Sequence, residues 1–158
     1  MILGVTGHRP DKLGGYGKQA AVKLVQFASI CLEEIKPDRV VTGMALGWDT
    51  AIAIACLELG IPYTAAVPFF GQELRWPAAS QEMYRKLLTY AAEVVTICEA
   101  YSPAAMQDRN EWIVAHCHEM LALYGGSPGG TRNCVRYADK CRIPVMNVWK
   151  EWRAYDAG

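Results

Sequence analysis

The chain lacks any long uninterrupted run of apolar residues, and no basic segment stands in front of one. It has 158 residues and opens directly on the strand-like M-I-L-G-V-T. A membrane-spanning helix needs about 20 consecutive apolar residues, and a secretory signal places a basic region before a shorter apolar one. We therefore expect no membrane partner and no signal peptide, and we predict a cytoplasmic protein.

An excess of charge of one sign is also missing. Lysine and arginine total 16, aspartate and glutamate total 16, and the formal net charge is +0. Proteins that attract nucleic acid or membrane surfaces through general electrostatics carry a basic excess or stripe. We therefore do not expect nucleic acid as a partner. Hydrophobic residues make up 52% of the chain and charged residues 20%, which indicates one globular domain with a genuine core.

The cysteines form no C-x-x-C pair, although the chain has six of them: Cys31, Cys56, Cys98, Cys117, Cys134 and Cys141. Several lie in apolar surroundings such as A-I-A-C-L, which is typical of buried reduced thiols rather than of a disulfide framework. His116 and His118 flank Cys117, but positions i and i+2 of a helix face different directions. We predict no metal site.

Two common nucleotide-binding motifs are absent as well. The sequence has no G-x-x-x-x-G-K-[ST], which argues against a Walker-type triphosphatase. It also has no G-x-G-x-x-G, which argues against a redox dinucleotide. We expect no cofactor.

What the sequence does contain is a regular alternation of short β-branched runs and longer helical patterns. The predicted strands are Ile2–Thr6, Arg39–Thr42, Tyr63–Val67, Val94–Cys98, Met120–Leu123 and Val145–Val148. The predicted helices are Lys18–Ile35, Thr50–Leu59, Ala79–Ala92, Asp108–His118 and Thr131–Lys140. This order predicts an α/β fold, a Rossmann-like three-layer sandwich with a mostly parallel central sheet. We expect a single domain over residues 1–149 and a short C-terminal tail, residues 150–158, as either a short helix or a frayed end.

Three glycine-containing turns follow predicted strands, so they should meet at the carboxyl edge of the sheet, where open α/β folds bind ligands. They are T-G-H-R-P (Thr6–Pro10), T-G-M-A-L-G-W-D-T-A (Thr42–Ala51) and G-G-S-P-G-G-T (Gly125–Thr131). Glycines leave backbone amides unobstructed, and a helix start attracts anions. Arginine grips phosphate with two parallel hydrogen bonds. The pattern predicts a phosphate site.

Two acidic positions have competing interpretations. Asp49 is either the N-cap of the following helix or an acceptor for a ribose hydroxyl or a reacting group. In D-R-N-E (Asp108–Glu111), either Asp108 caps a helix and the charges are solvated, or Arg109 and Asn110 face the crevice.

Taken together, G-V-T-G-H-R-P, K-L-G-G-Y, T-G-M-A-L-G-W-D-T-A, Q-E-L-R-W-P, R-N-E-W-I-V and G-G-T-R-N-C-V resemble the YpsA-like branch of the SLOG superfamily over nearly the whole chain. That superfamily also includes the DprA/Smf proteins and the Lonely Guy phosphoribohydrolases. The resemblance implies a Rossmann-like fold that binds nucleotides or molecules derived from them. By position it implies these ligand-binding residues: Gly7, His8, Arg9, Gly43, Gly47, Asp49, Trp76, Arg109, Asn110, Gly129, Gly130 and Thr131. Gln72 would complete the rim, and Trp76 or Tyr101 would stack on a base unless they only pack.

One position departs from the Lonely Guy pattern P-G-G-x-G-T-x-x-E. Cys134 stands where that family has its glutamate, and a thiol does not replace a carboxylate in N-glycosidic cleavage. The remaining candidate catalytic acids are Asp49 and Glu111, with Glu73 as a further option.

We therefore expect a protein that binds a nucleotide or nucleotide-derived signalling ligand, as a sensor or a sequestering protein. The alternative is a nucleotide N-glycosidase or phosphoribohydrolase, and a DNA-associated module is the third possibility. The resemblance and the aromatic carboxyl-terminal segment also favour a homo-oligomer.

Overall fold

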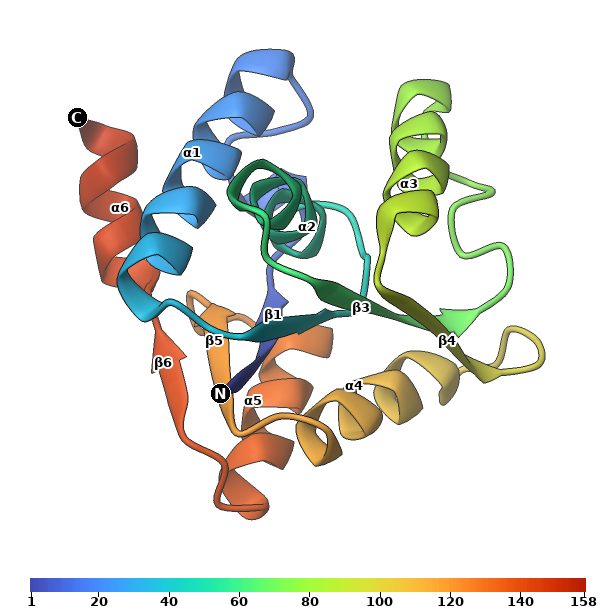
Figure 1. The fold of residues 1–158 in the computed structure, drawn as a ribbon. Helices are drawn as coiled ribbons and strands as arrows, with labels where there is room; N and C mark the ends of the chain where they lie inside the picture. The colour runs from blue at the N-terminus through green and yellow to red at the C-terminus, as the bar shows by residue number, and fades with distance from the viewer.

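The computed structural model describes residues 1–158, and a six-stranded sheet runs through its centre (Figure 1). The strands are β1 (Ile2–Gly7), β2 (Arg39–Thr42), β3 (Tyr63–Phe69), β4 (Glu93–Cys98), β5 (Glu119–Leu123) and β6 (Val145–Asn147). The helices are the short 3-10 helix η1 (Pro10–Lys12), then α1 (Lys18–Ile35), α2 (Trp48–Leu59), α3 (Ala78–Tyr90), α4 (Ala105–Ala115), α5 (Gly130–Lys140) and α6 (Trp149–Ala157). Every strand pair is parallel. The predicted α/β class and Rossmann-like three-layer arrangement are confirmed.

The strand order is β4-β3-β2-β1-β5-β6. The chain therefore moves outward from β1 through β4 and then returns to place β5 on the other side of β1. At such a reversal the loops that leave two neighbouring strands diverge and open a crevice at the carboxyl edge, where α/β proteins bind ligands. In this chain the reversal lies between β1 and β5.

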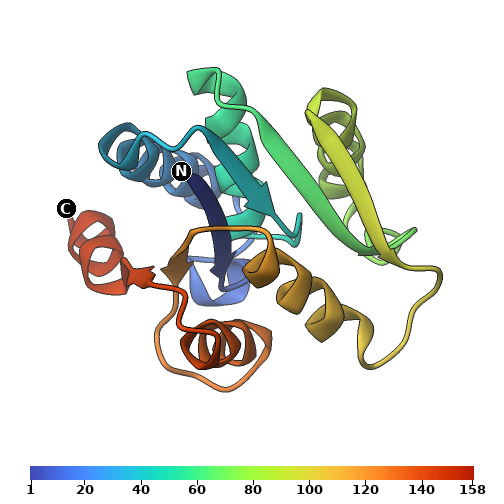
Figure 2. The same cartoon turned by 60° about the horizontal axis from the view of Figure 1, so that its bottom comes forward.

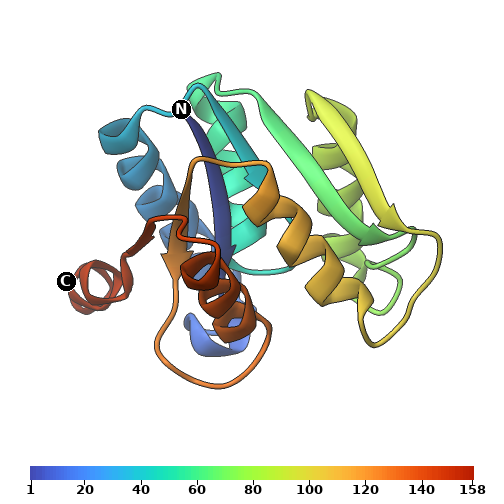
Figure 3. The ribbon, with the colours of Figure 1, turned by 90° about the horizontal axis from the view of Figure 1, so that it is seen from below.

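The two faces of the sheet bury separate hydrophobic cores. Helices α1, α2, α3 and α6 contribute to the larger core, which includes Phe27, Trp48 and Trp152. Helices α4 and α5 cover the opposite face with a smaller core that includes Ile113 and Cys134. In Figures 2 and 3, α4 and α5 lie side by side on one face of the sheet, opposite α2 and α3.

Several helices begin earlier than the sequence pattern indicated. Helix α2 begins at Trp48 with Gly47 as its N-cap residue, so Asp49 lies within the first turn and is not the N-cap. Helix α4 begins at Ala105, so Asp108 is likewise not the capping residue. The last residues form α6, whose Trp152 is only 2% exposed. No helix of the structure combines the length and apolar character that a membrane span needs.

Candidate functional site

A cavity of about 380 Å³ opens at the carboxyl edge, beside the reversal between β1 and β5. The ends of β1, η1, the first turn of α2, the first turns of α4 and the loop before α5 form its walls. Most of the predicted ligand-binding residues line it together: Gly7, His8, Arg9, Asp49, Arg109, Asn110, Gly129, Gly130 and Thr131. The three turns that the sequence placed at one edge therefore contribute to one cavity.

The glycine pair before α5 gives the cavity an exposed helix start. Gly129 is the N-cap residue with φ 141°, a conformation that favours glycine, and Gly130 is the first residue of the 11-residue helix. Apart from the chain neighbours and the backbone of α5 itself, no protein atom lies within 4 Å of where a Cβ would stand on either glycine. The first amides of a helix have no intrahelical acceptor and carry the positive end of its dipole. An anion can approach them directly here.

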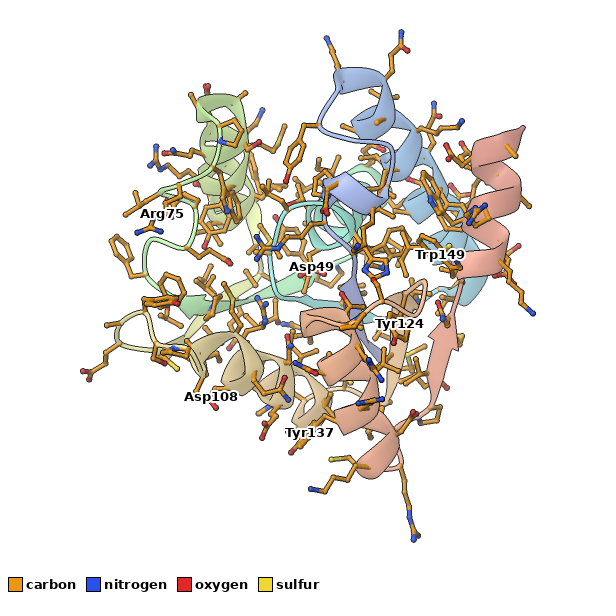
Figure 4. All side chains as sticks on the ribbon, turned by 180° about the vertical axis from the view of Figure 1, so that it is seen from behind. Asp49, Arg75, Asp108, Tyr124, Tyr137 and Trp149 are labelled. Carbon is orange, nitrogen blue, oxygen red and sulfur yellow. The ribbon has the colours of Figure 1, made fainter.

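His8 supports this loop rather than supplying positive charge. The amide of Gly125 donates a hydrogen bond to His8 Nε2 at 2.8 Å. Since an amide N–H only donates, Nε2 carries no proton and the ring is neutral. Burial lowers the pKa of His8. Its ring packs against those of Tyr124 and Trp149, with centroids 5.8 and 5.5 Å away; both of these aromatic residues are labelled in Figure 4. His8 therefore contributes a neutral ring to the crevice.

Arg109 and Asn110 connect α4 to two other walls. The Arg109 guanidinium donates through Nη1 to the carbonyl of Gly43 and through Nε to Asn110 Oδ1, 3.0 Å away. Asn110 Nδ2 donates to the carbonyl of Gly130 at 3.4 Å. Both side chains are only 6% exposed. They hold the loop that leads into α5 (the glycine loop, Gly125–Gly130) against the loop after β2 (the β2 loop, Gly43–Gly47). They also bring a guanidinium to the cavity wall.

Asp49, labelled in Figure 4, contributes a buried carboxyl group to the wall of the cavity. Its Oδ2 accepts a hydrogen bond from the Ala45 amide at 3.3 Å, whereas its buried Oδ1 has no partner. Burial raises the pKa of Asp49 to about 6, and the positive charges of Arg109 and Arg9 act in the opposite direction. A buried acceptor without a partner is costly, so Oδ1 is suited to a donor such as a hydroxyl.

Gly43 and Gly47 lie behind the cavity and do not line it. A Cβ on Gly43 would collide with the Arg109 guanidinium, and one on Gly47 would collide with the His8 carbonyl. Gly47 also has φ 90°. Both glycines therefore serve the close packing of the loops around the site.

Glu111 and Tyr101, two further candidates, lie outside this lining, and so does Cys134 at the position of the Lonely Guy glutamate. Glu111 is half-buried, and its Oε2 accepts a hydrogen bond from Gln107 at 3.3 Å. Cys134 is fully buried, and burial raises its pKa to about 11, so its thiol stays protonated. Tyr101 is 69% exposed and packs edge-on against Phe69.

The two histidines of the H-C-H segment serve separate backbone contacts. His116 Nδ1 lies 2.7 Å from the Trp112 carbonyl, while His118 Nδ1 accepts a hydrogen bond from the Ile2 amide. Nowhere do three or more histidine, cysteine, aspartate or glutamate side chains gather closely enough to hold a metal ion.

The structure adds lining residues that were not named among the predicted ligand-binding residues. Asp11, Lys12 and Ser127 line the cavity. Asp11 and Lys12 directly follow T-G-H-R-P, so their nearness in sequence was an available signal.

Trp76 and Gln72 line a neighbouring cavity of about 480 Å³ together with Tyr16 and Arg75.

Known proteins are similar to this chain in sequence and in fold. A family model described as the YspA SLOG family matches residues 3–141. The SPbeta prophage-derived protein YoqJ of Bacillus subtilis is 36% identical over 120 residues, which cover 65% of this chain and 70% of YoqJ. A UPF0398 protein of Bacillus pumilus is 29% identical over 164 residues, covering 93% of this chain and 87% of the relative.

Two solved structures of DNA processing protein A have a similar fold. The protein from Streptococcus pneumoniae aligns with a TM-score of 0.64 and 20% identity, over 91% of this chain. The Helicobacter pylori protein, whose structure describes a single-stranded DNA binding mode, aligns with a TM-score of 0.65 and 14% identity, over 92% of this chain. The chain spans only 48% and 63% of the length of those two proteins.

Proposed function

We propose that this chain, which belongs to the YspA SLOG family, binds a nucleotide or nucleotide-derived signalling ligand as a sensor or sequestering protein. The observation that carries the proposal is the exposed start of α5 inside the cavity. Gly130 has an ordinary negative φ and no neighbour that a side chain would disturb. Folding does not explain its glycine, whereas the close approach of a ligand does.

The charges around the cavity suit a phosphate at this helix start. The amides of Gly130 and Thr131 would donate to phosphate oxygens, and the exposed guanidinium of Arg9 would neutralise the charge. The free Oδ1 of Asp49 would accept a ribose hydroxyl. Arg109 would add positive charge from the wall without leaving its own hydrogen bonds.

Calorimetry tests this proposal with mononucleotides, dinucleotides, cyclic nucleotides and ADP-ribose. We expect at least one to bind, and we expect Arg9→Ala to weaken it by roughly 10- to 100-fold, as loss of a charge-assisted hydrogen bond would. Arg153→Ala, an exposed position on α6, should leave affinity unchanged. Absence of binding to every probe at millimolar concentration would overturn the proposal.

A second candidate function is cleavage of the N-glycosidic bond of the bound nucleotide. The raised pKa and the unpartnered Oδ1 of Asp49 favour it, because catalytic carboxyl groups have such environments. Chromatography should then detect a free base, and Asp49→Asn should abolish its release. Glu111→Gln is the matched control because Glu111 does not line the cavity. Binding without base release would remove this candidate.

The expectation that nucleic acid does not bind needs its own test, because a protein with the same fold is described by its single-stranded DNA binding mode. We propose that the small ligand is preferred. Gel retardation of a single-stranded oligonucleotide, measured against salt concentration, tests this directly. Strong, salt-sensitive retardation would reassign the cavity to a nucleic-acid strand.

A homo-oligomer and a cytoplasmic location complete the proposal. Native mass spectrometry of freshly purified protein would count the subunits and reveal any retained small molecule. A purely monomeric spectrum would contradict the homo-oligomer. Recovery of the protein in a membrane or secreted fraction would contradict the cytoplasmic location.

A further inference from the structure

A second cavity of about 480 Å³ adjoins the first and shares part of its wall. Its lining is Arg9, Tyr16, Leu46, Gln72, Arg75, Trp76, Pro77 and Met106. Arg9 and Met106 also line the first cavity. One molecule can therefore extend from the glycine loop, past Arg9, to the loop between β3 and α3, where Arg75 lies on the rim (Figure 4).

The second cavity differs from the first in its chemistry. It has two aromatic side chains, Tyr16 and Trp76, and two cations, Arg9 and Arg75, but no acidic side chain. Tyr16 is 60% exposed, which leaves its ring free to contact a ligand. Aromatic rings and guanidinium planes stack on nucleobases regardless of base identity, and arginine also binds phosphate. This combination suits a planar ring next to an anionic group.

Gln72 supplies an independent indication of a ligand. Its side chain is buried, and Nε2 donates to the Gly43 carbonyl and to the Tyr84 hydroxyl, each at 3.3 Å. Because a carbonyl oxygen only accepts, the contact with Gly43 fixes which end of the amide is nitrogen. The other end, Oε1, is buried without a partner. It requires a donor, such as an amino group or a hydroxyl of a bound molecule.

The two cavities also rest on a common support. The carbonyl of Gly43 accepts hydrogen bonds from both Arg109 of the first cavity and Gln72 of the second. The relative position of the two sites is thereby fixed by the β2 loop. A ligand that reaches both meets groups that are already arranged for it.

We propose, on the basis of the function proposed above, that the ligand has two nucleoside-like ends joined through phosphate. One end lies beside Asp49 in the first cavity, and the phosphate bridge runs from the glycine loop to Arg9. The second ring stacks between Tyr16 and Trp76 and donates to Gln72 Oε1. Each cavity alone is of ligand size, and the two share Arg9 and Met106.

Calorimetry with AMP and its pyrophosphate-linked dimer, P1,P2-di(adenosine-5′) diphosphate, tests the inference, together with the corresponding guanine pair. For at least one base we expect the dimer to bind at least tenfold more tightly than the monomer, because stacking of a second base contributes on that scale. Tyr16→Ala and Arg75→Ala should each weaken the dimer roughly tenfold and leave the monomer unchanged. Tyr90→Ala and Arg153→Ala, exposed positions that line neither cavity, are the matched controls.

The outcomes separate this inference from the proposed function. Equal affinity for monomer and dimer, or equal weakening of both in the variants, would overturn the two-part ligand and leave nucleotide binding intact. Failure of all four compounds would also overturn the two-part ligand, and only failure of the wider panel, including cyclic nucleotides and ADP-ribose, would overturn the proposed function itself. A single-stranded oligoadenylate whose affinity exceeds that of the dimer and grows with length would replace the small ligand by a nucleic-acid strand.

Discussion

Gly129 and Gly130 are adjacent in the sequence, but the backbone requires glycine at only one of them. Gly129 has φ 141° and ψ −165°, a region that other residues occupy only with strain of about 1–3 kcal/mol. Gly130 has no such requirement and begins a helix, where alanine has a higher propensity. The two adjacent glycines therefore have different explanations: backbone conformation for Gly129 and, in our proposal, the approach of a ligand for Gly130.

We predict that Gly130→Ala leaves the thermal midpoint unchanged or raises it, while the affinity for the phosphate ligand falls at least tenfold. A methyl group there meets only the space that the ligand would occupy. Thermal unfolding and calorimetry on the same preparation measure the two effects. Gly129→Ala is the contrasting variant and should lose both stability and affinity. Full ligand affinity in Gly130→Ala would mean that the phosphate does not approach this helix start.

Asp49 makes a prediction about pH. Its pKa is about 6 in the folded protein against an ordinary value of 3.8, so the unfolded chain ionises at lower pH than the folded one. The contribution of Asp49 to stability is therefore fully present at acid pH and is lost as the pH rises through about 6. Relative to the non-titrating variant Asp49→Asn, the wild type should lose about 2 kcal/mol of unfolding free energy between pH 4 and pH 7.

Denaturant titrations of both proteins across that range measure the difference. Because every other group is shared, the subtraction isolates Asp49 unless its replacement alters a neighbour. A difference that does not vary with pH would show that folding does not raise the pKa of Asp49, and it would weaken the case for Asp49 as a catalytic acid.

At the scale of elements, α6 supports the loop that carries the proposed phosphate site. Asn147 at the end of β6 accepts hydrogen bonds from the amides of Tyr124 and Trp149, each at 3.2 Å. The indole of Trp149 packs so closely on Gly125 that a Cβ there would lie 2.7 Å from it. Trp152, one turn further, packs against Phe27 with ring centroids 5.4 Å apart. The last residues of the chain therefore connect the core to the site.

We predict that Trp152→Ala costs about 3–5 kcal/mol of unfolding free energy, the usual cost of removing a buried tryptophan from a core. Arg153→Ala, the exposed neighbour, should cost less than about 0.5 kcal/mol. Urea titrations of both variants measure this directly. A loss as small as that of the control would indicate that α6 frays from the domain in solution.

The order and type of the elements were predictable because alternating β-branched and helical patterns depend on neighbouring residues. The helix starts at Trp48 and Ala105 were not, since no side-chain cap marks either of them. The roles of the glycines were the hardest to predict. Gly43 must be small because of Arg109, and His8 is neutral because of Gly125, and each partner lies far away in the sequence. Tyr16 and Arg75 lie within the quoted segments K-L-G-G-Y and Q-E-L-R-W-P, but only the fold brings them beside Arg9.

At the scale of the whole molecule, the proposed ligand lies between two hydrophobic layers of unequal size. The α1, α2, α3 and α6 side holds a cluster of 24 buried residues, whereas the α4 and α5 side holds a cluster of 7. Local opening requires less free energy where fewer apolar contacts are broken. The face formed by α4 and α5, which carries Arg109 and Gly130, should be the less stable part.

We therefore predict that, without ligand, the amides of α4 and α5 exchange with deuterium faster than those of α2. Bound ligand should slow them most, because it connects Arg109 and Gly130 of the weaker layer to Asp49 of the stronger one. At a ligand concentration 100 times Kd the added stability is about 2.7 kcal/mol, which should raise the thermal midpoint by roughly 5–10 °C. Hydrogen-exchange mass spectrometry resolves the helices separately. Protection confined to α2, with α4 and α5 unchanged, would place the ligand on one layer only and contradict a site built across both.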